Sequence, residues 1–226
     1  MLETSKLYHA RLDQFDDPFE GAVTNEYARL RDKGVVEPYF TLKYYEPWTL
    51  RISRLRSYAT CWHASEHESD SQWKLYASGG AGIAVVSTLE RLQQSVDFLP
   101  HIHGILGQVE YVDFEHHDMR RHPFGTPMRP GLLKRKSFEH EREVRGVVLT
   151  ELNKPQLELD EPFIAKLKDE MPCGITAKIN LRELILAIVT SPIAAPFVKE
   201  LVGIVTKRHG LDHLVRESQL RGTPMY

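Results

Sequence analysis

The sequence predicts an α+β protein, a single domain whose mixed, mainly antiparallel sheet is flanked by short helices. Short runs of apolar or alternating residues recur along the chain, each about as long as a strand and bounded by turn residues. Short helical segments with capping and stop residues lie between them. The 226 residues show no internal repeat and no low-complexity linker, so we expect one domain over residues 1–226.

The N-terminal part opens with a short expected strand at residues 7–10, followed by an acidic, turn-rich loop at 13–21. Pro18 fixes its own φ angle and favours an extended Asp17. A helix is expected from Asn25 to Lys33, with Gly34 as its stop. The aromatic segment 35–49 is compatible with a packed loop or with a lid over a pocket, and we favour the packed loop.

The remaining elements follow from apolar periodicity and from glycine or proline boundaries. We expect strands over residues 57–62, 82–88, 105–114, 173–179 and 184–189, and helices over 71–77, 89–96 and 197–209. The fully apolar run at 184–189 is expected at the centre of a sheet, because both of its faces must be covered. A terminal strand is expected near Leu214 and Val215, and the histidine-rich stretch 115–130 is expected as a surface loop.

The composition is that of a soluble globular protein, with 42 % hydrophobic and 27 % charged residues. A net charge of −2 gives no global field that would attract nucleic acid or an anionic membrane. We expect a cytoplasmic protein, since no signal-like or membrane-spanning apolar run occurs. Cys61 and Cys173 lie far apart and form no CxxC motif, so we expect reduced core thiols and no metal site.

The most informative stretch is 134–150, which reads KRKSFEHEREVRGVVLT. If a strand begins near His140, its pleat places Glu141, Glu143 and Arg145 on one face, with Arg142 on the other. Acidic side chains that lead into an apolar strand indicate a site at a strand end, where a sheet presents groups to a ligand. The alternative is a solvated edge strand with cross-strand ion pairs.

Two further groups of residues are expected near this strand. Asp17 and Glu20 carry charges beside apolar anchors, so their loop is expected to lie against the strand and to pair with Lys136, Arg142 or Arg145. The large aromatic side chains nearby are expected to line one pocket or one core cluster, because such side chains bury a large area. They are Trp62, Trp73 and Tyr76.

Four segments together resemble a widespread bacterial family known as domain of unknown function twenty-nine seventy-one. They are residues 7–21 (LYHARLDQFDDPFEG), 61–85 (CW, ES, W..Y and GIAV), 136–145 (K.F..E.E.R) and 188–211. Tyr8 and Arg11 match the first motif of the family, whereas His9 and Ala10 stand where relatives have a Lys-Tyr pair. The resemblance implies little about activity, because the family has none established.

The chain also resembles ADP-ribosyltransferases of the Arg-Ser-Glu type, which would make it a NAD-using enzyme of a defence or toxin kind. Arg11 would hold the nicotinamide dinucleotide, and Ser87 with Thr88 would support the pocket. Glu143 would act on the oxocarbenium-like ribosyl centre and Glu141 would assist it. NAD would then be a substrate rather than a resident cofactor.

Two other interpretations stay open, as does the identity of a small-molecule or protein ligand. In the first, the protein is a non-catalytic regulatory or interaction module, and its charges form a buried network that fixes the fold. That network would join Glu141, Glu143 and Arg145 to Lys136 and the Asp17 loop. In the second, a metal-dependent nuclease would use the same carboxylates, with Asp17 and Glu20, as ligands.

Overall fold

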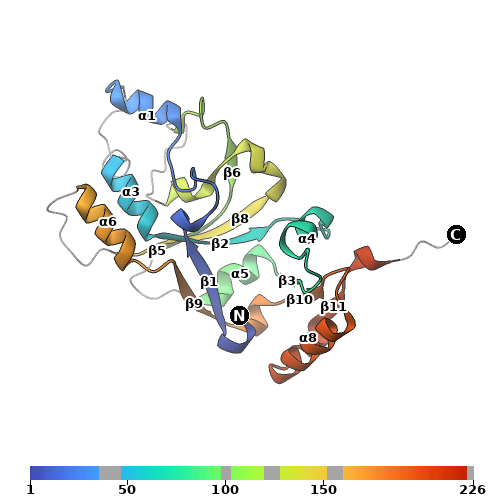
Figure 1. Ribbon diagram of the computed structural model, residues 1–226. Coiled ribbons are helices and arrows are strands. Elements are labelled where there is room, and N and C mark those ends of the chain that lie inside the picture. The colour runs from blue at the N-terminus through green and yellow to red at the C-terminus, as the bar shows by residue number, and fades with distance from the viewer. Residues whose placement is uncertain (36–46, 98–102, 120–127, 152–159, 223–226) are drawn as a thin grey trace. The chain divides into compact units, whose positions relative to one another are not determined.

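The structure is a computed structural model that describes residues 1–35, 47–97, 103–119, 128–151 and 160–222 (Figure 1). These residues fall into two compact units. The first unit comprises Met1–Leu7, Ser65–Asp97 and Ala177–Tyr226, and the second comprises Tyr8–Ala64 and Phe98–Thr176. The α+β class with a mixed, mainly antiparallel sheet and short helices is confirmed. The expectation of one domain over residues 1–226 stays a prediction.

The second unit is built on an antiparallel sheet in which β8 is paired on both sides. Its strands are β1 (Lys6–Arg11), β2 (Ser57–His63), β5 (His103–Gln108), β8 (Glu143–Leu149) and β9 (Gly174–Ile179). Their order is β9-β1-β2-β8-β5, and the chain passes between the units within β1 and within β9. Cys61 is opposite Arg145 on the β2 side of β8, and Gly107 is opposite it on the β5 side.

The described residues of the second unit also form two parallel strands and three α-helices. They are β6 (Glu110–Val112), β7 (Leu133–Arg135), α1 (Asn25–Asp32), α3 (Pro47–Arg56) and α6 (Glu161–Glu170). Helices α3 and α6 lie side by side (Figure 1) and bury Ile52, Leu55, Ile164 and Leu167 against each other. A second cluster, formed by Leu12, Ala59, Met128 and Val147, lies beside the ionic residues described below.

The first unit contains a three-stranded sheet in the order β11-β10-β3, with β10 antiparallel to β3 and parallel to β11. Its elements are α4 (Asp70–Tyr76), β3 (Ile83–Val86), α5 (Leu89–Ser95), β4 (Val96–Asp97), α7 (Leu181–Leu184), β10 (Ala187–Thr190), α8 (Pro196–Arg208) and β11 (Val215–Glu217). Strand β10 is buried along its whole length, as expected for a central strand. Helix α8 begins at Pro196, and the chain turns at Gly210 with φ +65°.

Three expected elements differ from the structure. Residues 105–114 form β5 and β6 rather than one strand, and the two belong to different sheets. Residues 184–189 begin in α7 and enter β10 only at Ala187. Helix α3 begins at Pro47, inside the expected aromatic loop, while the rest of that loop and part of the histidine-rich stretch lie outside the described residues. None of the helices in the described ranges has the length and hydropathy that crossing a membrane requires.

Candidate functional site

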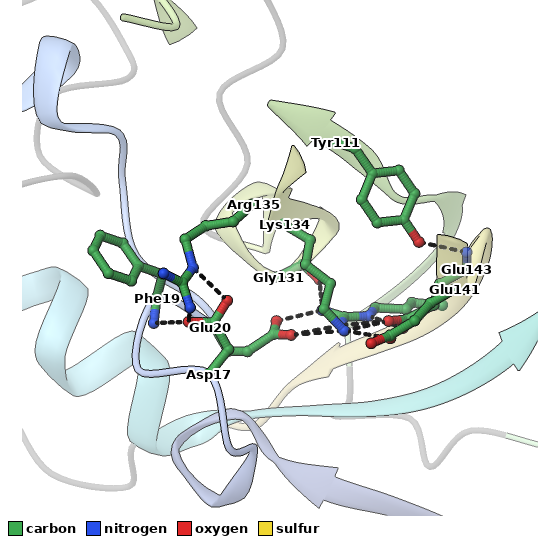
Figure 2. Close-up of polar contacts among 10 residues, drawn as sticks. Asp17, Phe19, Glu20, Tyr111, Gly131, Lys134, Arg135, Glu141 and Glu143 are labelled. Atoms are coloured by element: carbon green, nitrogen blue, oxygen red, sulfur yellow. Dashed lines mark hydrogen bonds and ion pairs between the residues drawn. The ribbon is translucent and has the colours of Figure 1, made fainter. Parts of the chain in front are cut away.

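Five ionisable side chains of the second unit meet at the start of β8 (Figure 2). They are Glu20, Lys134, Glu141, Glu143 and Arg145, and we call them the ion network. Glu143 and Arg145 are two residues apart on β8, so the pleat directs them to the same face. The other three come from β7, from the 3-10 helix η5 (Lys136–Glu141), and from the acidic loop after β1.

Lys134 lies between the two carboxylates that follow it in sequence. Its Nζ atom is 2.6 Å from Glu141 Oε2 and 2.6 Å from Glu143 Oε1. Glu20 Oε1 lies 3.5 Å from the same nitrogen. The lysine side chain is only 7 % exposed, so these contacts replace the water that its ammonium group would otherwise hold.

Arg145 is fully buried and joins Glu143 to Glu20. Its Nε donates to Glu143 Oε2 at 2.6 Å, while Nη1 and Nη2 donate to the two Glu20 oxygens at 2.6 and 2.8 Å. Nη1 also donates to the Gly131 carbonyl at 3.0 Å. A guanidinium group presents its donors in a fixed fork, which suits this simultaneous pairing with two carboxylates.

Glu141 reaches Lys134 through a left-handed turn, not through the pleat of a strand. The expected strand start near His140 is therefore wrong: Glu141 ends η5, and Arg142 adopts φ 45° and ψ 55°. Such a conformation is costly for a residue other than glycine and persists only where the surroundings hold it. Here the Arg142 N–H donates to the Glu139 carbonyl, and its own carbonyl accepts from Ala64. The turn brings Glu141 and Glu143 to one ammonium group.

The expected contact between the acidic loop and the 141–145 segment is confirmed through Glu20 and Arg145. Asp17 anchors the middle of the same loop, because Arg135 Nε and Nη2 each lie 3.0 Å from its carboxylate. The Asp17 carboxylate also accepts from the Phe19 N–H at 3.0 Å. These bonds hold the loop in one conformation and so fix the position of Glu20.

Aromatic rings cover the cations of this region. The Arg145 guanidinium lies 5.4 Å from the Phe15 ring centre, and Arg135 lies 4.8 Å from that of Phe19. Lys134 Nζ is 4.9 Å from the centre of the Phe138 ring. Each ring face attracts a cation and keeps water from it, which strengthens the neighbouring ion pairs.

The environment moves the pKa values of the two neighbouring glutamates in opposite directions. Burial disfavours the charge of Glu143, but hydrogen bonds from Arg145 and Lys134 outweigh it and hold the pKa well below its ordinary value of 4.5. Burial raises the pKa of Glu141, and the contact with Glu143 raises it further, against the pull of Lys134. Of these two neighbouring glutamates, Glu141 is therefore the one that takes up a proton more readily.

Tyr111 closes the cluster on the β6 side. Its hydroxyl oxygen accepts a hydrogen bond from the Glu143 backbone N–H at 2.7 Å, as Figure 2 shows. Burial raises the pKa of the Tyr111 hydroxyl, so the group stays protonated near neutral pH. It can therefore donate its own proton to a further acceptor.

Lys136 does not take the role predicted for it. The structure leaves it exposed, and Lys134 is the lysine of the network. Three consecutive cations precede the glutamates, and sequence spacing does not tell which of them points inward. The burial pattern of β7, with Leu133 and Lys134 buried and Arg135 half-buried, identifies Lys134.

The first motif of the chain forms a separate buried contact. Arg11 is 2 % exposed; it pairs with Asp13 at 2.6 Å and donates to the backbone carbonyls of Lys168 and Met171. His9 is fully buried on the same strand. The donors of Arg11 are thus engaged within the protein, which leaves the expected grip on a dinucleotide without support from this geometry.

The remaining predicted site residues lie in different parts of the chain. Ser87 belongs to the first unit, where its hydroxyl donates to the Leu184 carbonyl at 2.6 Å. Trp73 lies in the same unit, half-buried, and donates to Glu68 at 3.0 Å. Trp62 is half-buried in β2 of the second unit. Tyr76 is 74 % exposed, so its expected place in one buried aromatic cluster is wrong.

Both cysteines are free thiols, but neither is the core residue that the sequence predicts. Cys61 and Cys173 are exposed, one opposite Arg145 on β2 and the other just before β9. Within the described ranges, no group of three or more His, Cys, Asp or Glu side chains is arranged so that it could hold a metal ion. A surface cavity of about 710 Å³ lies in the first unit and is lined by the ends of α5, β9 and α7, apart from the residues of the ion network.

Comparisons with protein-family models, with curated proteins and with solved structures find no match to this chain. The resemblance to domain of unknown function twenty-nine seventy-one therefore stays a prediction. The ion network itself is the strongest candidate for a functional site.

Proposed function

We propose that the protein is an enzyme that transfers or hydrolyses a glycosyl group of the ADP-ribosyl type, with the Glu141–Glu143 pair as its acid–base centre. One observation carries the proposal: two adjacent carboxyl groups share one lysine, and their pKa values are moved apart. Such a split makes one carboxyl group easier to protonate than its neighbour, which is the difference that glycosyl chemistry uses. A nicotinamide dinucleotide is the substrate class that we propose.

The geometry assigns different roles to the two glutamates. Glu143 is 5 % exposed and clamped by Arg145 and Lys134, so it acts as a fixed negative charge that stabilises an oxocarbenium-like centre. Glu141 is 15 % exposed and has the raised pKa, so it is the group that exchanges a proton with a reacting atom. The sequence favours Glu143 as the main catalytic residue, whereas we propose Glu141 as the residue that transfers the proton.

A non-catalytic regulatory or interaction module is the second candidate. The observation in its favour is that cations contact every carboxylate of the network, while Glu20 and Arg145 are 1 % and 0 % exposed. A network so enclosed fixes the conformation of the acidic loop without any chemistry. The nuclease interpretation gains no comparable observation from the described residues.

The free thiols accord with the proposed cytoplasmic location.

Nicotinamide release, measured together with melting temperature, separates the two candidates. We expect the dinucleotide to raise the melting temperature of the wild type and to be cleaved. Glu141→Gln should lower the cleavage rate by about 10²- to 10⁴-fold, since an amide carries no transferable proton. Its melting temperature should stay within about 4 °C of wild type, because the amide oxygen still accepts from Lys134.

Glu139→Gln is the matched control, because Glu139 lies exposed on the same 3-10 helix. It should leave both cleavage and melting unchanged. Parallel melts with ADP-ribose, other nucleotides, Mn²⁺ and Mg²⁺ test other ligand classes. If no ligand shifts the melting temperature and no cleavage occurs, the enzyme proposal fails and the module is the better account. A shift with a divalent metal alone would instead favour the nuclease.

A further inference from the structure

Helix α8 of the first unit leaves a continuous apolar stripe in solvent. Its buried side carries Val198, Val202 and Thr206. On the opposite side Phe197, Leu201 and Ile204 are 62 %, 54 % and 46 % exposed. Three large apolar side chains in a row on one short helix are more than the scattered exposed leucine or isoleucine that any surface shows.

The spacing of this stripe has the pattern of a helix–helix seam. Phe197, Leu201, Ile204 and Arg208 follow one another at intervals of four, three and four residues, the a/d spacing of a coiled coil. At about 100° per residue, these four positions fall within an arc of about 60°. The Arg208 side chain is 67 % exposed, so the whole seam is accessible.

We propose that this seam packs against the same seam of a second copy of the chain, antiparallel and around a twofold axis. Leu201 of one copy then lies against Ile204 of the other, and Phe197 lies against Arg208. The centre of the contact is apolar, and each end pairs a cation with an aromatic ring. Because a twofold axis relates the two copies, each of these two residue pairs occurs twice in the contact.

The charges beside the seam favour a second copy over another partner. Glu200 and Lys207 are both exposed and lie on the same edge of the stripe, two helical turns apart. In the antiparallel arrangement Glu200 of each copy comes beside Lys207 of the other. In a parallel arrangement the edges that carry these charges would lie on opposite sides of the contact, so neither charge would face a charge of the other copy. The surface is therefore complementary to itself.

The contact is small, and this sets the expected affinity. The seam of 12 residues is about 16 Å long, and a stable interface buries about 800 Å² per partner. Ile193, three residues before the start of α8, is a further exposed apolar residue at 64 %. We therefore expect a dimer that forms with rising concentration in the micromolar range.

Sedimentation equilibrium of the full chain tests the proposal. Between about 1 and 500 μM at low salt, the mass should rise from the monomer value of 26.0 kDa towards twice that value. Leu201→Glu and Ile204→Glu should each weaken the dimer at least about 100-fold, because each puts two charges into the apolar centre. Leu75→Glu, at a leucine of α4 that is 57 % exposed, is the matched control and should not affect it. Circular dichroism confirms the fold of each variant.

Charge reversal tests the orientation independently of any loss of apolar area. Glu200→Lys alone and Lys207→Glu alone should each weaken the dimer about tenfold at low salt, since both ends gain a repulsive pair. The double variant should regain wild-type affinity. A wild type that stays monomeric at the highest concentration overturns the proposal. A dimer that tolerates Leu201→Glu and Ile204→Glu, or a double variant without recovery, does so as well.

Discussion

Arg145 is the residue on which the ion network most depends. It is fully buried, and it contacts Glu20, Glu143 and the Gly131 carbonyl at once. Removing one partner of a buried ion pair leaves the other charge without compensation in a medium of low polarity. The cost of that unpaired charge is far larger than the stability that the intact pair contributes. Replacing Arg145 should therefore lower the free energy of unfolding strongly.

We expect Arg145→Met to lower the free energy of unfolding by about 3–5 kcal/mol, measured by urea denaturation at neutral pH. Methionine fills a similar volume, so the loss reports on the stranded carboxylates rather than on a cavity. Lys136→Met is the control, because Lys136 is an exposed cation nearby, and it should change stability by less than about 0.5 kcal/mol. Equal effects of the two substitutions would show that the network contributes little to stability.

At this scale the sequence predicts every member of the ion network except its lysine. Glu20, Glu141, Glu143 and Arg145 are expected to gather, and the structure brings them together. The lysine could not be chosen, because the choice depends on where β7 ends and η5 begins. That boundary is set by contacts far away in the sequence.

Among the elements, the acidic loop depends on a glycine at its end. Gly21 has φ +74°, and a Cβ placed there would lie 2.9 Å from Leu12 Cδ1 and 3.3 Å from Arg54 Cγ. The conformation and the crowding both disfavour a side chain. Gly203 in α8 is the opposite case: no atom lies within 4 Å of an added Cβ, and the backbone is helical.

We therefore expect Gly21→Ala to lower the free energy of unfolding by about 1–3 kcal/mol and to loosen the contact between Glu20 and Arg145. Gly203→Ala should raise it by up to about 1 kcal/mol, because alanine is the better helix former. Thermal and urea unfolding of the two variants measure both effects. If Gly21→Ala proves neutral, the loop relaxes around the new side chain and does not fix Glu20 rigidly.

Most elements could be predicted because their periodicity and capping residues are local properties. Thr24, for example, accepts from the Tyr27 N–H at the start of α1, as a residue of its type should. Two predictions, the strand start near His140 and the single strand over residues 105–114, fail because of contacts that are distant in the sequence. The turn at Arg142 is held by the Ala64 N–H, and the break between β5 and β6 lies where the Val109 N–H donates to the Glu143 carbonyl. Neither hydrogen bond can be predicted from the residues that surround it in the sequence.

For the whole molecule, the α+β class follows from the sequence, whereas the division into two units does not. Each unit is assembled from separate stretches of chain, and the crossings fall within β1 and β9 or in short segments. No composition shift or linker marks such a boundary, because the residues at the crossings of β1 and β9 belong to continuous strands. Sequence-based division into domains depends on linkers, so it has no signal here.

The stability of the whole molecule depends on pH, and the ion network should dominate this dependence at acidic pH. The pKa of Glu143 is lower in the folded protein than its ordinary value of 4.5. Its contribution is therefore fully present above about pH 4.5 and is lost as the pH falls towards the folded-state pKa. The raised pKa of Glu141 has the opposite sign: its contribution is present below pH 4.5 and is lost as the pH rises through its folded-state pKa.

We expect the free energy of unfolding of the wild type to fall steeply below about pH 4.5, with Glu143 contributing up to about 1.4 kcal/mol per pH unit. Glu143→Gln should be less stable at neutral pH and should show a shallower acid slope, since it no longer takes up that proton on unfolding.

Glu141→Gln should retain the acid slope and gain stability relative to wild type at higher pH, because the amide removes the excess negative charge beside Glu143. Urea midpoints measured between about pH 3 and pH 7 test these slopes, with the exposed Glu139→Gln as the control that follows wild type. An acid slope in Glu143→Gln as steep as that of the wild type would mean that other carboxylates drive the acid loss of stability.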